Sequence, residues 1–124
     1  MKTKKIYVCS PLSGDIETNI EKAKGYCEYI IKICGAIPIC PQIYFTQFLD
    51  DTNPAEREFG LKAGLQLLSE CDELYYFGNV ISKGMKIEIC YAVEHKIPVL
   101  YIPDCEHEEY SKLKTHNEEV MFDV

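Results

Sequence analysis

Apolar and polar positions along the chain alternate in blocks that predict strands and helices in turn. Short apolar runs rich in β-branched and aromatic residues lie at 4–10, 36–41, 72–78 and 97–102, and each has the length of a strand. Between them, apolar residues recur with helical spacing over 18–34, 53–70 and 83–95. Strand, helix and strand in succession imply parallel strands joined by right-handed crossovers. The pattern therefore predicts an α/β fold, doubly wound and Rossmann- or flavodoxin-like. We expect a mostly parallel sheet of about four to five strands with helices on both faces.

Local residues mark the ends of the predicted helices. Thr18 and Glu21 have capping-box spacing at the start of the first helix, and Gly35 supplies a left-handed stop at its end. Asn53 followed by Pro54 is typical of a helix start, with a capping side chain and a proline at the first helical position. The second helix is therefore expected to begin at residue 54 and to end near residue 70.

The region between the second and third strands has two unusual features. Residues 42–53, "QIYFTQFLDDTN", follow neither period and are predicted to be a long functional loop or lid, or simply a solvated loop. Gly60 and Gly64 lie one turn apart on the helix that follows, at a cost of roughly 1 kcal/mol each relative to alanine. Such a pair indicates that another helix or a ligand approaches this face closely.

Composition narrows the class of protein. The 124 residues, 47% of them apolar, fit one domain over 1–124 with a polar C-terminal extension from about 103. No run approaches the roughly 20 apolar residues of a membrane span. Seven cysteines, an odd number mostly within apolar runs, indicate reduced, buried thiols, and the three histidines form no compact cluster. We expect a cytoplasmic protein with no metal, no cofactor and no membrane partner.

The charge of the chain argues against polymeric nucleic acid as a partner. The formal net charge is −7, and Arg57 is the only arginine. A small anionic ligand stays possible, because helix N-termini and one or two cations can bind a phosphate within an acidic protein.

Ligands of open parallel sheets bind beyond the carboxyl ends of the strands, where two loops of this chain are rich in small and hydroxyl residues. The first is 10–14, with Ser10 and Ser13, and the second is 79–84, with Ser82. Backbone N–H groups and these hydroxyls could bind an anion, although serine-rich loops are also ordinary turns. Neither loop has the G-x-G-x-x-G or Walker pattern, so a dinucleotide or NTPase site is not indicated.

Glu88 is the most unusual residue of the sequence. It lies within 81–102, a stretch that otherwise has the pattern of a buried helix followed by a buried strand. An unpaired charge there is costly unless it is solvated or has a function. The simpler interpretation is a carboxylate near a helix N-terminus, where the macrodipole favours it. Tyr7, in the first strand, has an equally simple interpretation as a packing residue.

Three segments together resemble a known family. "IYVCSPLSG" in the first strand, "CDELYYFG" in the third and "SKGMKIEICYA" in the last helix are similar to the nucleoside 2-deoxyribosyltransferase superfamily. The likeness includes its deoxynucleoside 5′-monophosphate N-glycosidase branch, and a bacterial and phage subgroup shares the "YFTQFLDD" and "GM-x-x-E-I" stretches. The resemblance covers roughly residues 5 to 102.

The resemblance implies roles for individual residues. Glu88 falls on the nucleophile that attacks the anomeric carbon of the sugar, and Tyr7 on the tyrosine that orients this carboxylate. Ser82 matches a hydroxyl that contacts a 5′-phosphate, Gly84 keeps that turn close, and Gln42 falls near the base or sugar. The remaining substrate contacts are expected at Ser10, Leu12, Ser13, Gly14, Asn79 and Met85. Family enzymes complete their sites across subunits, which implies a homodimer or higher homo-oligomer, with residues 117–124 as a candidate for reaching across.

The chain departs from the family at two positions. The acid that assists departure of the base would lie at residue 64, which is Gly64 here, and Pro11 replaces a serine of the phosphate-binding branch. Asp51, Glu56 or Glu58 could replace the missing acid. Without a proton donor, hydrolysis is expected to be slower by about 10²–10⁴-fold.

Three functions are therefore open from the sequence. The first is an N-glycosidase or deoxyribosyltransferase-like enzyme acting on a small (deoxy)nucleoside or nucleoside 5′-monophosphate. The second is a nucleotide-binding module without turnover, which senses or sequesters a nucleotide-derived molecule, as the missing acid suggests. The third is an interaction domain without any ligand.

Overall fold

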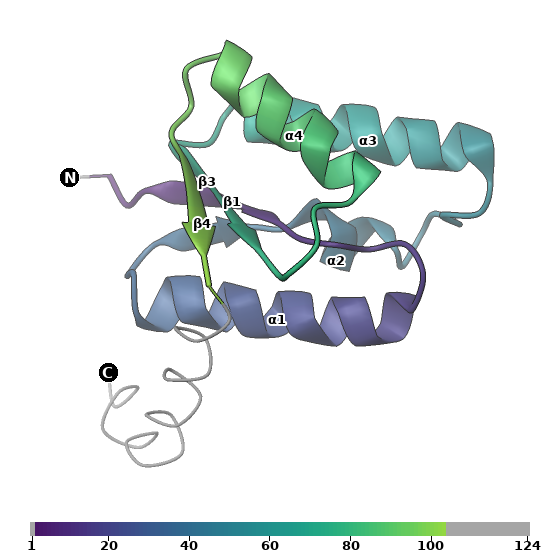
Figure 1. Cartoon of the computed structure of the whole chain (residues 1–124), viewed down its shortest axis with the longest axis horizontal. Coiled ribbons are helices and arrows are strands. Elements are labelled where there is room, and N and C mark those ends of the chain that lie inside the picture. The colour runs from purple at the N-terminus through teal and green to yellow at the C-terminus, as the bar shows by residue number, and fades with distance from the viewer. Residues whose placement is uncertain (1, 104–124) are drawn as a thin grey trace.

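The computed structural model describes residues 2–103 and contains one parallel sheet flanked by helices (Figure 1). The strands are β1 (Lys5–Cys9), β2 (Ile37–Ile39), β3 (Glu73–Phe77) and β4 (Val99–Ile102). The helices are α1 (Ile16–Lys32), α2 (Pro41–Phe45), α3 (Pro54–Leu68) and α4 (Lys83–Glu94). Within these residues the sheet has four strands in the order β2-β1-β3-β4, and every pairing is parallel. The predicted α/β fold is therefore confirmed.

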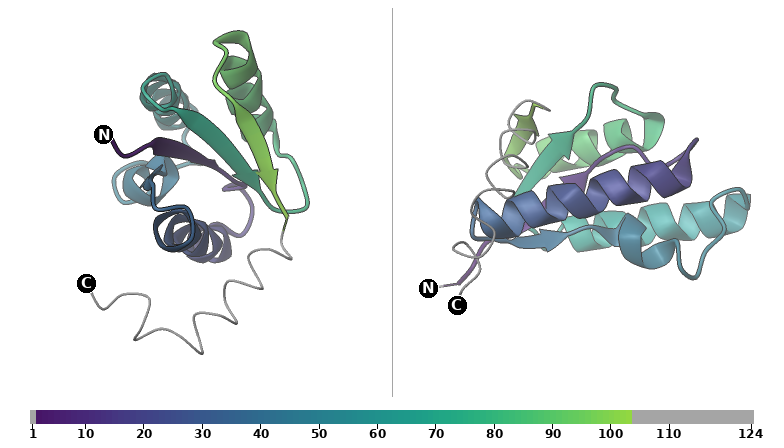
Figure 2. Two further views of the ribbon diagram at one scale, coloured as in Figure 1. Left: turned by 90° about the vertical axis from the view of Figure 1, so that its left-hand side faces the viewer. Right: turned by 90° about the horizontal axis from the view of Figure 1, so that it is seen from below.

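The helices cover both faces of the sheet, with α1 on one side and α3 and α4 on the other (Figures 1 and 2). Alternation along β1 separates the two cores, since successive side chains of a strand point to opposite faces. Ile6 and Val8 belong to the core under α1, and Tyr7 and Cys9 to the core under α3 and α4. These four of the five side chains of β1 are at most 2% exposed, so this strand is the centre of the domain.

Aromatic packing dominates the core under α1. The ring of Phe77 stacks on Tyr26 with centroids 4.3 Å apart, and its edge contacts Tyr29 at 6.4 Å. These rings come from β3 and α1, so the contact fixes the first helix against the centre of the sheet. Most of the candidate site lies on the opposite face and at the end of the strands, although Val8 of this core also reaches the cavity.

The N-cap of the first helix lies three residues before the predicted one. Asp15, not Thr18, is the N-cap, and its carboxylate accepts hydrogen bonds from the Thr18 backbone N–H at 3.2 Å and the Thr18 hydroxyl at 2.7 Å. The capping box of Thr18 and Glu21 is therefore wrong, because an aspartate just ahead competes as the acceptor. The stop at Gly35 is confirmed, with φ of 65° and a hydrogen bond from its N–H to the Ile31 carbonyl.

The segment predicted to be a long loop contains a short helix. Pro41 begins α2, and the Thr46 hydroxyl closes it by donating to the Gln42 carbonyl at 2.7 Å. The remaining loop turns at Asp50, whose side chain accepts from the Thr52 N–H at 2.9 Å. Helical periodicity cannot reveal a helix of 5 residues, since it has little more than one turn.

The last helix and strand are buried on one side only. In α4, Ile87 and Val93 are 42% and 62% exposed, and β4 is an edge strand with Leu100 exposed. The prediction that this helix and strand are buried on all sides is therefore wrong.

The six cysteines of the described residues are free thiols, as the sequence predicts. Two of them, Cys34 and Cys90, are exposed, so the prediction that the thiols are buried is wrong for these two.

Two expectations fall on residues that the structure does not describe. The polar extension beyond residue 103 and the candidate subunit-bridging segment 117–124 lie outside the described residues. The homo-oligomer therefore stays a prediction. No helix within residues 2–103 has the length and apolar character needed to cross a membrane.

The N-terminus of α3 gives a test of the local folding signal. The Asn53 side chain accepts from the backbone N–H groups of Ala55 at 3.0 Å and Glu56 at 3.1 Å, as the sequence predicts. Replacing Asn53 with alanine leaves both donors without this acceptor, so the free energy of unfolding in urea should fall by about 1 kcal/mol. Asn53→Asp keeps the acceptor and should stay within a few tenths of wild type. Equal losses in both variants would contradict a capping role.

Candidate active site

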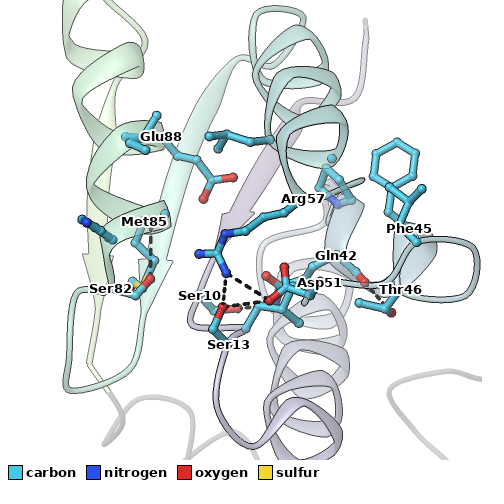
Figure 3. Close-up of a pocket in the computed structure, with 18 of the residues that line it drawn as sticks. Ser10, Ser13, Gln42, Phe45, Thr46, Asp51, Arg57, Ser82, Met85 and Glu88 are labelled. Atoms are coloured by element: carbon cyan, nitrogen blue, oxygen red, sulfur yellow. Dashed lines mark hydrogen bonds and ion pairs between the residues drawn. The ribbon is translucent and has the colours of Figure 1, made fainter. Parts of the chain in front are cut away.

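A cavity of about 500 Å³ opens beyond the carboxyl end of β1, between the loops that leave β1 and β3 (Figure 3). This is the edge of the sheet at which the strand order reverses, since β1 connects to β2 on one side and pairs with β3 on the other. The volume is within the range of small-molecule sites. It is lined by Tyr7, Val8, Ser10, Leu12, Ser13, Pro41, Gln42, Phe45, Thr46, Leu49, Asp51, Glu56, Arg57, Gly60, Leu61, Ser82, Lys83, Gly84, Met85, Ile87 and Glu88.

Glu88 projects from the second turn of α4 into this cavity, where two donors from β1 hold its carboxylate. The Tyr7 hydroxyl donates to Oε2, and the Cys9 thiol donates to Oε1 at 3.4 Å. Tyr7 and Cys9 are 2% and 0% exposed, so both donors are fixed by packing in the core. Each oxygen of the carboxylate thus has a donor, and the predicted pairing of Tyr7 with Glu88 exists in the structure.

Burial changes the acid strength of all three groups. It raises the pKa of Glu88 from 4.5 to about 7, against the hydrogen bonds from Tyr7 and Cys9, which lower it. Burial and the neighbouring carboxylate also raise the pKa of Tyr7 and that of Cys9, so both stay protonated as donors. Near neutral pH the site therefore holds one carboxyl group that changes charge easily.

Gly64 explains why this carboxylate and tyrosine can meet. A Cβ at this position would lie 3.1 Å from the Tyr7 hydroxyl oxygen and 3.9 Å from Oε2 of Glu88. At Gly64 the nearest group is thus a side chain of the strand β1, followed by Glu88 of the neighbouring helix α4. Gly60 has a different neighbour, because its Cβ would lie 3.5 Å from a methyl carbon of Leu49.

The predicted hydroxyl groups are in the cavity wall, and several are hydrogen-bonded within the protein. Ser10 is 5% exposed and accepts from the Gln42 side-chain amide at 2.9 Å, which ties the end of β1 to α2. Ser82 is the N-cap of α4, and its hydroxyl accepts from the Met85 backbone N–H at 3.3 Å. Ser82 therefore has a structural role in addition to its place at the cavity.

An arginine enters the cavity from α3 and contacts the loop after β1. Nη1 of Arg57 donates to the Ser13 hydroxyl at 3.0 Å and to Oδ2 of Asp51 at 3.2 Å, and Ser13 itself donates to Asp51 at 3.0 Å (Figure 3). These three residues come from segments that are far apart in the chain. They give the cavity a second polar region besides Glu88.

Three predicted site residues do not line the cavity. Gly14 has φ of 100° and serves the turn into α1, where glycine avoids the strain of a left-handed backbone. Asn79 is exposed in the loop after β3. Glu58 pairs with Lys62 at 3.0 Å on the exposed side of α3, so only Asp51 and Glu56 of the possible replacement acids lie at the cavity.

Arg57 and Lys83 line the cavity and Cys9 holds Glu88, although none of the three was a predicted site residue. A signal for Arg57 was present, because residues 57, 60, 61 and 64 have the i, i+3, i+4, i+7 spacing of one helix face. The glycine pair therefore marked the face on which the arginine lies. The apolar wall includes Phe45 of α2, Leu49 of the loop that follows and Leu61 of α3. Within residues 2–103, no three His, Cys, Asp or Glu side chains cluster as a metal site would require.

The chain belongs to the family described as a domain of unknown function, DUF7768, whose profile matches residues 4–102. No curated protein matches the sequence. Among solved structures, the fold is similar to that of a 2-deoxyribosyltransferase from the psychrotolerant bacterium Bacillus psychrosaccharolyticus, with a TM-score of 0.59 and 20% identity. The match covers 80% of this chain and 72% of that chain, and at this identity it shows the fold alone.

The two glycines of α3 should respond oppositely to alanine. Gly60→Ala meets only a flexible leucine and should gain up to about 1 kcal/mol of helix propensity in urea unfolding. Gly64→Ala places a methyl group 3.1 Å from the Tyr7 hydroxyl oxygen and should lose stability instead. In a double-mutant cycle, Tyr7→Phe should relieve part of the cost of Gly64→Ala. Additive effects would show that the hydroxyl does not limit this position.

The buried carboxylate should make stability depend on pH. With the pKa of Glu88 at about 7 in the folded chain and 4.5 in the unfolded reference, the folded state retains a proton that the unfolded state has released between these values. Stability therefore falls as pH rises through this window, by up to about 3 kcal/mol and less where water reaches the carboxylate. Urea unfolding at pH 5 and pH 8 should show that Glu88→Gln gains relative to wild type at pH 8. An unchanged difference would contradict a raised pKa.

Proposed function

We propose that the protein is an N-glycosidase or deoxyribosyltransferase-like enzyme, which acts on a small (deoxy)nucleoside or nucleoside 5′-monophosphate with Glu88 as the nucleophile. One observation supports this most strongly. A carboxylate lies at a cavity of about 500 Å³, and both of its oxygens accept hydrogen bonds from fixed donors of β1. The fold shared with a 2-deoxyribosyltransferase and the motifs around Glu88 agree with this choice.

The chemistry follows from the position of the carboxylate. An oxygen of ionised Glu88 attacks the anomeric carbon, and the bond from this carbon to the base nitrogen breaks with its electron pair leaving on the base. Water or a second base then attacks the same carbon and releases the carboxylate, which gives hydrolysis or exchange. The Tyr7 and Cys9 donors keep the carboxylate in one orientation and stabilise its charge whenever it is free.

The leaving base needs a proton, and the position of the family's acid is Gly64 here. The Asp51 carboxylate already accepts hydrogen bonds from Arg57 and Ser13 within the protein. Glu56 also lines the cavity, and among the described residues its carboxylate accepts a single hydrogen bond, from the Asp50 N–H at 3.3 Å. The base is therefore protonated by Glu56 or by water, and turnover is slow.

A second function, ligand binding without turnover, has one observation in its favour. The space in which a side-chain acid would extend from residue 64 is closed by the Tyr7 hydroxyl, 3.1 Å from the position of a Cβ. A cavity that keeps its walls but lacks this acid could sense or sequester a nucleotide-derived molecule. Both functions use the same cavity and differ only in whether Glu88 forms a bond to the sugar.

Replacement of Glu88 decides between the two functions. Wild type is incubated with the common nucleosides and their 5′-monophosphates, with and without an acceptor base, and free or exchanged base is measured by chromatography. Glu88→Gln keeps the shape of the side chain but removes the nucleophile, so base release should fall by about 10³-fold or more. Glu94→Gln on the same helix, whose side chain is exposed and does not line this cavity, should match wild type.

The alternative gives a different result in the same samples. If no base is released, but one nucleotide raises the melting temperature of wild type, the protein is a binding module. Base release that survives in Glu88→Gln would contradict the nucleophile, and a lack of both release and stabilisation would contradict both functions.

A further inference from the structure

The charge of Arg57 is only partly used within the protein. Its side chain is 50% exposed, although it reaches into the cavity, and only Nη1 takes part in hydrogen bonds, to Ser13 and Asp51. Among residues 2–103 no group accepts from Nε or Nη2. A guanidinium has five N–H donors in a planar fork that fits a carboxylate or phosphate with two parallel bonds, so this fork has donors left for a ligand.

The other groups near this end of the cavity leave Arg57 as the main means of recognising an anion. The loop after β1 has Pro11, which lacks an N–H donor, and Ser10, whose hydroxyl accepts from Gln42, carries no charge. Lys83 also lines the cavity and has no ion-pair partner among the described residues. Two cations thus reach a cavity of an otherwise acidic chain, and only one of them is neutralised.

The partner of Arg57 is weakly held. Asp51 contacts it through a single N–O pair at 3.2 Å, in an ion pair that water reaches. Such pairs contribute little to stability, whereas a phosphate bound by two guanidinium N–H groups forms a stronger, charge-assisted contact. An anionic group that enters the cavity can therefore replace Asp51 on Arg57 with a net gain.

Building on the proposed function, we propose that the ligand is a nucleoside 5′-monophosphate and that Arg57 binds its phosphate, with Asp51 as the internal competitor. Arg57 is then the residue that separates monophosphates from nucleosides. Because the phosphate must displace Asp51 from Arg57, the ion pair of these two residues lowers the affinity for the phosphate. The geometry supports this through a single residue of α3, not through the serine-rich loops.

The test is the ratio of two affinities, measured by titration calorimetry with a 2′-deoxynucleoside and its 5′-monophosphate. All proteins carry Glu88→Gln so that no ligand is consumed. We expect the monophosphate to bind at least about 10-fold tighter than the nucleoside, and Arg57→Gln to reduce this ratio by roughly 10- to 100-fold. Lys62→Gln removes an exposed cation of the same helix that pairs with Glu58, and should leave the ratio unchanged.

Asp51→Asn separates recognition from a structural role. If Asp51 competes with the ligand, its removal raises monophosphate affinity by about threefold or more while Arg57→Gln lowers it. If the ion pair only holds the loop in place, both variants lower the affinity for both ligands alike, which would overturn the proposal. Equal binding of nucleoside and monophosphate, or no binding of either, would also overturn it.

The affinities from calorimetry and the base release measured by chromatography together distinguish this proposal from the proposed enzyme activity. Monophosphate binding that depends on Arg57, together with no base release by wild type, supports the phosphate site and contradicts the enzyme. Base release from nucleosides and monophosphates at equal rates, with equal affinities, supports the enzyme and contradicts the phosphate site.

Discussion

The contact of Tyr7 and Cys9 with Glu88 is the interaction on which the arrangement of the site depends. It places a carboxyl group where burial raises its pKa to about 7, and it requires two donors from the central strand to face α4. It also requires α3 to approach without a side chain, since a methyl group at Gly64 would press on the Tyr7 hydroxyl. Three elements are thus positioned around one carboxylate, and the cavity forms beside it.

The order of helices and strands could be predicted from the sequence because the apolar periodicity is strong. The pairing of Tyr7 with Glu88 could be predicted because both residues fall on a motif of the family that the chain resembles. The sequence was insufficient where two local signals compete, as at the start of α1, or where an element is too short for a period, as in α2. Arg57 was missed for another reason. The spacing of residues 57, 60, 61 and 64 marks the helix face on which Arg57 lies. Its contacts with Ser13 and Asp51 join the turn after β1 to the start of α3, and no local pattern specifies such long-range partners.

Under the proposed function, the site combines a held carboxylate with the loss of an acid. The carboxylate and the cavity would suit attack on a sugar carbon, whereas glycine at position 64 provides no proton for the leaving base. At the other end of the cavity, Arg57 pairs with Asp51 through one nitrogen and has further N–H donors left. This region therefore favours a ligand with a negative charge. Affinity and turnover therefore depend on different residues of the same cavity.

The central place of β1 has a consequence for how the protein folds. The strand β1 pairs with β2 and, across 67 residues, with β3, where the Lys5 N–H also donates to Asp72 at 2.8 Å. Its partners on both sides must exist before it is enclosed, and contacts so distant along the chain slow folding. The two donors of Glu88 lie on this strand and are at most 2% exposed. Separating them from one another would require opening the centre of the sheet, so the pair of donors is as long-lived as the sheet itself.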